Sequence, residues 1–183
     1  MAVLDAAYNA TIWLLYLMQS NGCEKNGLPM NVGDVIEHEM VLPSTKTEAW
    51  EALTTAEGLS GWWSESVEID LRPGGAISFD MGGHGLHPAR VEAVEPEQRF
   101  VMSWRLFQRE EGADAVPELT SEVEFRLEDH PMGMLLKLRE PGFAALPEAL
   151  SAMTLYKNEF GWDDDALPRL RCYLKKGARV ARQ

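Results

Sequence analysis

The residue with the clearest capacity for chemistry is Glu140, a carboxylate that follows a run of alternating apolar side chains. Counting by twos along a predicted strand from Met134 through Leu136 and Leu138 puts Glu140 on the same inward face. An ionisable group on the inner face of an apolar cavity can act as a general acid or base. The alternative is a structural role, in which Glu140 pairs with a nearby arginine or a backbone N–H at the end of the strand.

A metal site is not indicated by the histidines of this sequence. His84 and His87 follow Asp80 within a glycine-rich turn. Two imidazoles need a third ligand and a rigid frame to hold a metal ion, and such a turn supplies neither. The acidic triplet Asp163–Asp165 is interpreted as helix-capping rather than calcium-binding. We therefore expect no metal and no cofactor, and without a G-x-S-x-G motif there is no candidate nucleophile.

A second set of residues is suited to binding rather than to reaction. Aromatic and methionine side chains recur in phase with the predicted inner faces, and such soft, bulky groups suit an adaptable apolar pocket. The alternative is that they simply fill the core. The residues that we expect to line a ligand site are Trp62, Trp63, Phe79, Met81, Met102, Trp104, Phe125, Leu136, Leu138, Met153, Tyr156 and Phe160.

The elements that must position these residues begin with a strand and two short helices. Val35–Leu42 alternates in the manner of a strand. The capping-box spacing of Thr45 and Glu48 predicts a first helix, and its repeat from Thr54 predicts a second, which runs into the pair Trp62-Trp63.

Period-two alternation then predicts a run of strands between Ile77 and Glu140, each with one polar face. A long helical pattern follows from Pro147, and Pro168 within it predicts a kink or a restart near Asp163–Asp165. This helix is the only long amphipathic element available to cover the apolar face of the sheet.

Length and charge narrow the classes of function. The chain has 183 residues and a formal net charge of −12, which argues against binding to nucleic acid or to an anionic membrane. The apolar run Ile12–Met18 is far shorter than the roughly 20 residues that span a bilayer. Cys23 and Cys172 lie far apart without the spacing of paired ligands, which favours a reducing, cytoplasmic location.

Residues 1–33 differ from the rest, because the amphipathic pattern begins only after Met30. We expect an N-terminal extension over residues 1–33 and a single domain over residues 34–183. Translation from Met30 would explain the extension; an additional packed helix is the alternative, and a membrane or export role is the third.

Several motifs occur in an order that resembles one protein family. They are Trp50–Thr54, Trp62-Trp63, Arg72–Gly75, Leu136–Glu140 and Gly161-Trp162. Over roughly residues 34–176 this order resembles the START-like (SRPBCC) superfamily, and specifically the branch named after the activator of the heat-shock-protein-90 ATPase. Two positions depart from the pattern: Asn158 stands where many relatives carry a histidine, and Pro141 where a serine is usual. The resemblance therefore transfers no role for that histidine.

The resemblance implies an α+β helix-grip fold. In this fold a curved antiparallel sheet of about six or seven strands wraps around a long C-terminal helix, with two short helices after the first strand. It also implies an apolar cavity between the sheet and that helix.

The fold alone does not decide the function, so three functions remain open. The sequence favours the binding of a small hydrophobic molecule and leans away from an enzyme. The first alternative is a cavity enzyme of cyclase, hydrolase or dehydratase type, with Glu140 transferring protons. The second is a protein-interaction or co-chaperone-like module that uses the exposed side of the sheet. The oligomeric state is open, a homodimer included.

Overall fold

The computed structural model describes residues 34–106, 120–146 and 148–180, without the side chains of positions 84, 148–150, 152, 153 and 178–180. All of these residues belong to one compact unit, Val32–Gln183. The predicted boundary between an extension and a domain at residues 33 and 34 stays a prediction.

Seven antiparallel strands form a single sheet in the order β1-β7-β6-β5-β4-β3-β2. The strands are β1 (Val35–Leu42), β2 (Ser66–Ile69), β3 (Ala76–Asp80), β4 (Leu86–Glu95), β5 (Arg99–Arg105), β6 (Thr120–His130) and β7 (Gly133–Pro141). Five of the six pairings join strands that follow each other in the chain, and β1 closes the other edge against β7. The predicted antiparallel sheet is confirmed.

The two faces of the sheet differ as the alternation predicted. On β6, the buried Val123 and Phe125 alternate with the exposed Glu122 and Arg126. A bulge in β4, between Val91 and Ala93, interrupts the register with β5. It adds to the bend of the sheet. The short strand β2 was not predicted.

Two short helices follow β1, as expected. Helix α2 (Lys46–Thr54) begins with the predicted capping box, in which the Thr45 hydroxyl accepts from the backbone N–H of Glu48. Helix α3 (Ala56–Trp62) is capped by Thr55, whose hydroxyl accepts from Gly58 N–H. The predicted cap at Thr54 was wrong by one residue, because the Thr54 hydroxyl instead donates to the carbonyl of Trp50.

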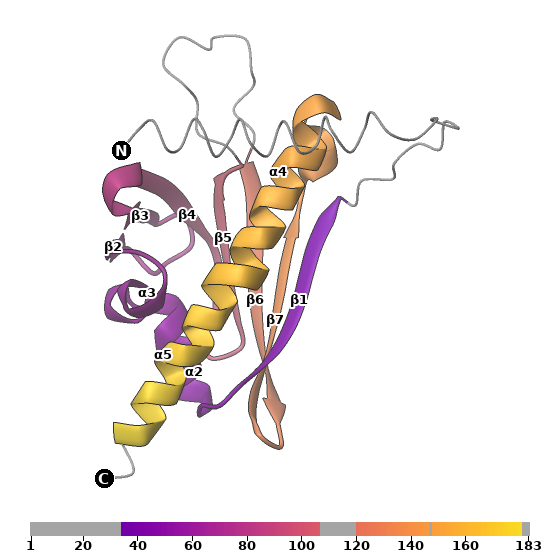
Figure 1. Ribbon diagram of the computed structural model, residues 1–183. Coiled ribbons are helices and arrows are strands. Elements are labelled where there is room, and N and C mark those ends of the chain that lie inside the picture. Colours follow the sequence, from indigo (N-terminus) through magenta and orange to yellow (C-terminus); the bar gives the residue numbers. More distant parts are fainter. Residues whose placement is uncertain (1–33, 107–119, 147, 181–183) are drawn as a thin grey trace. The chain divides into compact units, whose positions relative to one another are not determined.

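The C-terminal helical segment crosses the concave face of the sheet (Figure 1) and has three parts. Helix α4 (Glu148–Phe160) leads into a π-helical turn, η3 (Gly161–Ala166), and then into α5 (Leu167–Val180). Pro168 has no N–H to offer the preceding turn, and the wider turn lies directly before it, where a kink was predicted. This arrangement confirms the helix-grip architecture.

The acidic triplet does not cap a helix. The backbone stays helical from α4 through η3 into α5, and none of these described elements starts at Asp163–Asp165. Asp165 instead pairs with Arg169, one turn further along. Two short 3-10 turns, η1 (Gly82–His84) and η2 (Phe143–Ala145), complete the described elements. In the part of the chain that the structure describes, none of the helices has the length and apolarity to cross a bilayer.

Candidate functional site

Six aromatic rings meet between the sheet and the C-terminal helical segment, and Trp63 lies at their centre. Trp63 follows α3, and its ring contacts five others. The centroid distances are 5.1 Å to Trp62, 4.8 Å to Phe79, 5.6 Å to Trp104, 6.4 Å to Phe125 and 5.1 Å to Trp162. The cluster therefore ties α3 to three strands and to η3.

Glu140 lies beside this cluster and is completely buried. Its Oε1 accepts hydrogen bonds from Ser121 Oγ at 2.6 Å, from Trp104 Nε1 at 2.7 Å and from Asn158 Nδ2 at 3.2 Å. Its Oε2 accepts from Trp162 Nε1 at 2.7 Å. The predicted inward direction of Glu140 is confirmed, and its partners are side chains of β5, β6, α4 and η3 rather than an arginine or a backbone N–H.

The hydrogen-bond directions in this network are fixed by chemistry. Indole N–H and amide NH₂ groups only donate. The Ser121 hydroxyl accepts from Trp104 Nε1 at 3.0 Å, which leaves its own hydrogen for Glu140. Within the described part of the chain the carboxylate is thus held by four neutral donors, and both of its oxygens act as acceptors.

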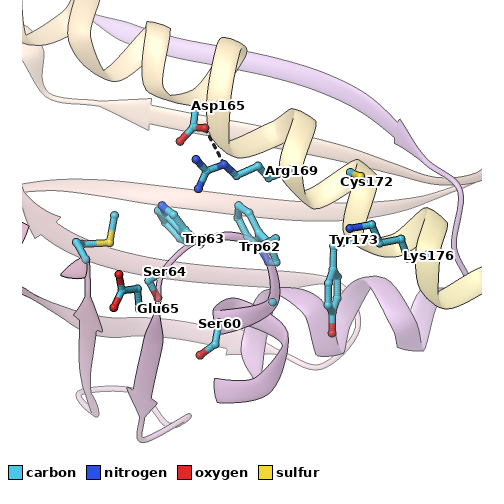
Figure 2. Close-up of a pocket in the computed structure, with 12 residues that line it drawn as sticks. Ser60, Trp62, Trp63, Ser64, Glu65, Asp165, Arg169, Cys172, Tyr173 and Lys176 are labelled. Atoms are coloured by element: carbon cyan, nitrogen blue, oxygen red, sulfur yellow. Dashed lines mark ion pairs between the residues drawn. The ribbon is translucent and has the colours of Figure 1, made fainter. Parts of the chain in front are cut away.

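A pocket of about 570 Å³ opens at the edge of the aromatic cluster. One wall is the end of α3 and the segment that follows it, and the other wall is the side of η3 and α5 (Figure 2). The residues that line the pocket are Ser60, Gly61, Trp62, Trp63, Ser64, Glu65, Met81, Asp165, Arg169, Cys172, Tyr173 and Lys176. The volume falls within the ~300–1,000 Å³ typical of small-molecule sites.

At one side of the pocket, α3 and α5 pack closely against each other. A Cβ atom at Gly61 would lie 2.3 Å from the Tyr173 ring, so the absent side chain is what lets α3 approach α5 at this point. Tyr173 extends from α5 toward α3 (Figure 2).

Trp63 links the pocket to the buried carboxylate. It lines the pocket and also contacts Trp104 and Trp162, the two indoles that donate to Glu140. Neither Glu140 nor any of its four donors lines the pocket. This pocket lies beside the aromatic cluster, at the edge of the region between sheet and helix in which the cavity was predicted.

Nine of the twelve predicted ligand-site residues lie in or against the core. Trp62, Trp63 and Met81 line the pocket, and Trp104 belongs to the Glu140 network. The other five are buried in the apolar core: Phe79, Met102, Phe125, Leu136 and Leu138. For all nine, the binding role stays a prediction.

The expected inward placement is wrong for Tyr156 and Phe160. They are 56% and 46% exposed and stack on each other on the outer side of α4, with centroids 6.5 Å apart. The inner face of α4 carries the buried Ser151 and Thr154 instead. The side chain of Met153, the remaining predicted residue, lies outside the described residues.

Several residues of the site were not predicted from the sequence. Ser121 gave a signal, because it is in phase with Val123 and Phe125 and so puts a polar group on the inner face of β6. The pocket residues Arg169, Tyr173 and Lys176 gave none, because they belong to the side of α5 and not to its buried apolar stripe.

Comparison with known proteins identifies the fold. The family described as "Activator of Hsp90 ATPase homolog 1-like protein" matches residues 44–174. Among curated proteins, none matches the chain significantly.

Solved structures share this architecture at low sequence identity. Protein MLL2253 from Mesorhizobium loti is 20% identical, with a TM-score of 0.65 over 78% of this chain and 97% of that one. DynU16, from the dynemicin biosynthetic locus, is 20% identical, with a TM-score of 0.64 over 79% of this chain. This chain spans only 48% of DynU16. CalU16 from Micromonospora echinospora is 24% identical, with a TM-score of 0.55 over 81% of this chain and 80% of that one.

These structural likenesses establish the fold alone, whereas the family match extends over well more than half of the chain. The predicted resemblance to this branch of the START-like superfamily is therefore confirmed. The chain belongs to the family of Activator of Hsp90 ATPase homolog 1-like proteins.

Proposed function

We propose that this protein binds a small, largely apolar molecule in the pocket between α3 and α5. The observation that supports the proposal is the pair Trp62 and Trp63, which stack at 17° and line the pocket while belonging to the aromatic cluster. Trp62 is buried, with 4% of its surface exposed, and Trp63 is half-buried, so the contact area that the pair offers to a bound ring or chain comes mainly from the indole of Trp63. The family fold fits a ligand-binding domain, and the apolar ligand itself is our proposal.

The alternative of a cavity enzyme has less support. Glu140 is buried as that alternative requires, but both of its oxygens are occupied by donors and it does not line the pocket. A bound molecule would have to displace the aromatic cluster to reach it. Binding without chemistry needs no such rearrangement.

The alternative of an interaction module on the exposed side of the sheet also has less support. That side carries ion pairs such as Lys137 with Glu128 and Arg139 with Glu37. Interface cores are usually depleted in such charged residues. A cytoplasmic location stays a prediction from the sequence.

A fluorescent apolar probe tests the proposal directly. Phenylnaphthylamine, a neutral dye, is titrated into the wild type and into two variants with the same substitution. Ser60→Trp fills the pocket, whereas Ser66→Trp lies on the exposed side of β2 and does not line it. We expect saturable binding to the wild type and to Ser66→Trp, and a loss of about tenfold or more in affinity for Ser60→Trp.

Equal affinities for the two tryptophan variants, or no saturable binding to the wild type, would overturn the proposal. Native mass spectrometry of the freshly purified protein adds a second measurement. A co-purifying small molecule that is retained by Ser66→Trp and lost from Ser60→Trp would support this pocket as its site.

A further inference from the structure

We infer that the ligand of this pocket carries an anionic group and that Lys176 binds it. The inference rests on the proposed binding function and adds the chemical class of the ligand: an apolar body with a carboxylate, sulfonate or similar oxyanion at one end. It is carried by the distribution of charge around the pocket.

Four charged side chains line the pocket, and two of them neutralise each other. Arg169 Nε lies 2.7 Å from Asp165 Oδ1, one helical turn away, and Figure 2 shows this pair beside Trp63. The other two charged residues are Glu65 and Lys176. Among the described residues, no carboxylate lies within ion-pair distance of the Lys176 ammonium, so this cation is available to a ligand.

Glu65 and Lys176 lie at opposite ends of the pocket (Figure 2). The stacked Trp62 and Trp63 lie between them. A ligand whose apolar body contacts Trp63 therefore meets a negative charge at one end of the pocket and a positive charge at the other. An anionic group is repelled by Glu65 and attracted by Lys176, which orients the molecule along the pocket.

The wider charge distribution favours an anion at the Lys176 end. Residues 167–183 contain 6 of the 17 basic residues and no acidic residue. The rest of the chain has 11 basic and 29 acidic residues, a formal charge of −18. Arg171 and Lys175, like Lys176, are exposed on α5. The surface of α5 is thus locally positive on an otherwise strongly negative protein, and such a surface attracts anions.

Lys175 provides a matched control for Lys176. The two lysines are adjacent and both are exposed, but Lys175 lines a separate groove of about 450 Å³ on the other side of α5, next to His38 and Met40. General attraction to a basic helix would involve both lysines. A specific contact in the pocket would involve only Lys176.

Two dyes that share one ring system separate charge from apolar contact. Anilinonaphthalene sulfonate is phenylnaphthylamine with an added sulfonate, so the pair differs by the anionic group alone. Both dyes are titrated into the wild type, Lys176→Gln and Lys175→Gln. We expect Lys176→Gln to weaken binding of the sulfonate about twofold to fivefold, the effect of losing one exposed ion pair. Lys175→Gln should bind both dyes like the wild type, and in Lys176→Gln the loss of affinity for the sulfonate should exceed any loss for the neutral dye.

The outcomes distinguish this inference from the function on which it rests. Unchanged sulfonate affinity in Lys176→Gln, or equal losses in both lysine variants, overturns the inference while saturable binding of the neutral dye still supports the pocket. Failure of both dyes to bind the wild type overturns the proposed function itself.

Discussion

The indole N–H of Trp162 donates to Oε2 of Glu140 over 2.7 Å, and this bond joins the π-helical turn η3 to the last strand of the sheet. The other carboxylate oxygen accepts from side chains of β5, β6 and α4. The buried side chain of Glu140 thus links β7 to β5, to β6 and to the C-terminal helical segment. Buried polar networks of this kind specify one packing, provided that every member has its partner.

Replacing Glu140 by Gln should lower the free energy of unfolding by about 2 kcal/mol. One accepting carboxylate oxygen is then replaced by an amide NH₂ group, which cannot accept a hydrogen bond from the donor that faces it. Urea unfolding followed by tryptophan fluorescence measures the change. Glu122→Gln is the control, since Glu122 lies exposed on β6 and its loss should cost less than about 0.5 kcal/mol. Equal stability of the two variants would show that the network adds nothing. Affinity for phenylnaphthylamine should survive in folded Glu140→Gln, because Glu140 does not line the pocket.

Trp162→Phe tests the same network from the helix side. Phenylalanine keeps most of the ring packing but removes the N–H, which leaves Oε2 of Glu140 without its donor. Because both substitutions break the same bond, the loss in the double variant with Glu140→Gln should be smaller than the sum of the single losses, by about 1 kcal/mol. The free energies of unfolding of all four proteins give the coupling. Strictly additive losses would contradict a direct interaction.

The same network explains why the helical phase of α4 was predicted wrongly. Asn158 and Trp162 are one turn apart, and both must reach Glu140. Tyr156 and Phe160 each precede one of these residues by two positions, which is about 200° around a helix, so they face outward. The sequence prediction used the apolar spacing of Tyr156 and Phe160. The face of α4 that points inward is instead the one whose residues donate hydrogen bonds to the buried carboxylate of Glu140.

Most of the sheet could be predicted because each strand is long enough to show alternation. The inward direction of Glu140 followed from this alternation along β7. Strand β2 has only four residues, too few for a period to appear, and it is recognisable only from its pairing with β3. The pocket was not predictable for a related reason: its walls come from residues 60–65, Met81 and residues 165–176, which only the three-dimensional fold brings together.

The free energy of unfolding should depend on pH through Glu124, which lies on the outer face of the sheet. Burial would raise the pKa of Glu124, but hydrogen bonds from Arg126 and Arg99 outweigh burial and hold the pKa below its ordinary value of 4.5. A lowered folded-state pKa stabilises the fold above the unfolded value, and this contribution is lost as the pH falls through the folded value.

Glu124→Gln should therefore lower the free energy of unfolding by about 1 kcal/mol at neutral pH, and the difference from the wild type should shrink below about pH 4. Urea unfolding across this pH range checks the expectation. Glu122→Gln, on the same face of β6, is the control, and its free energy of unfolding should differ from that of the wild type by a constant amount across this pH range. A constant difference for Glu124→Gln down to strong acid would refute the ion-pair explanation.

Gly58 sets how closely α2 approaches α3, the short helix that leads into the pocket tryptophans Trp62 and Trp63. A Cβ atom at this position would lie 2.2 Å from the Glu51 carbonyl oxygen and 2.7 Å from Ala52 Cα, and these backbone atoms of α2 cannot move aside without shifting the helix. Gly58→Ala should cost about 2 kcal/mol or more.

Gly177 in α5 is the matched control, since nothing lies within 4 Å of a Cβ atom there. Gly177→Ala should stabilise the protein by about 0.5–1 kcal/mol, because alanine is the better helix former. Denaturant midpoints of the two variants should therefore move in opposite directions. Because Gly58 lies in α3 a short way before Trp62 and Trp63, Gly58→Ala should also weaken binding of phenylnaphthylamine, whereas Gly177→Ala should leave it unchanged. A Gly58→Ala protein as stable as the wild type would mean that α2 and α3 can separate without cost, and the pocket wall would then not be the rigid surface on which binding depends.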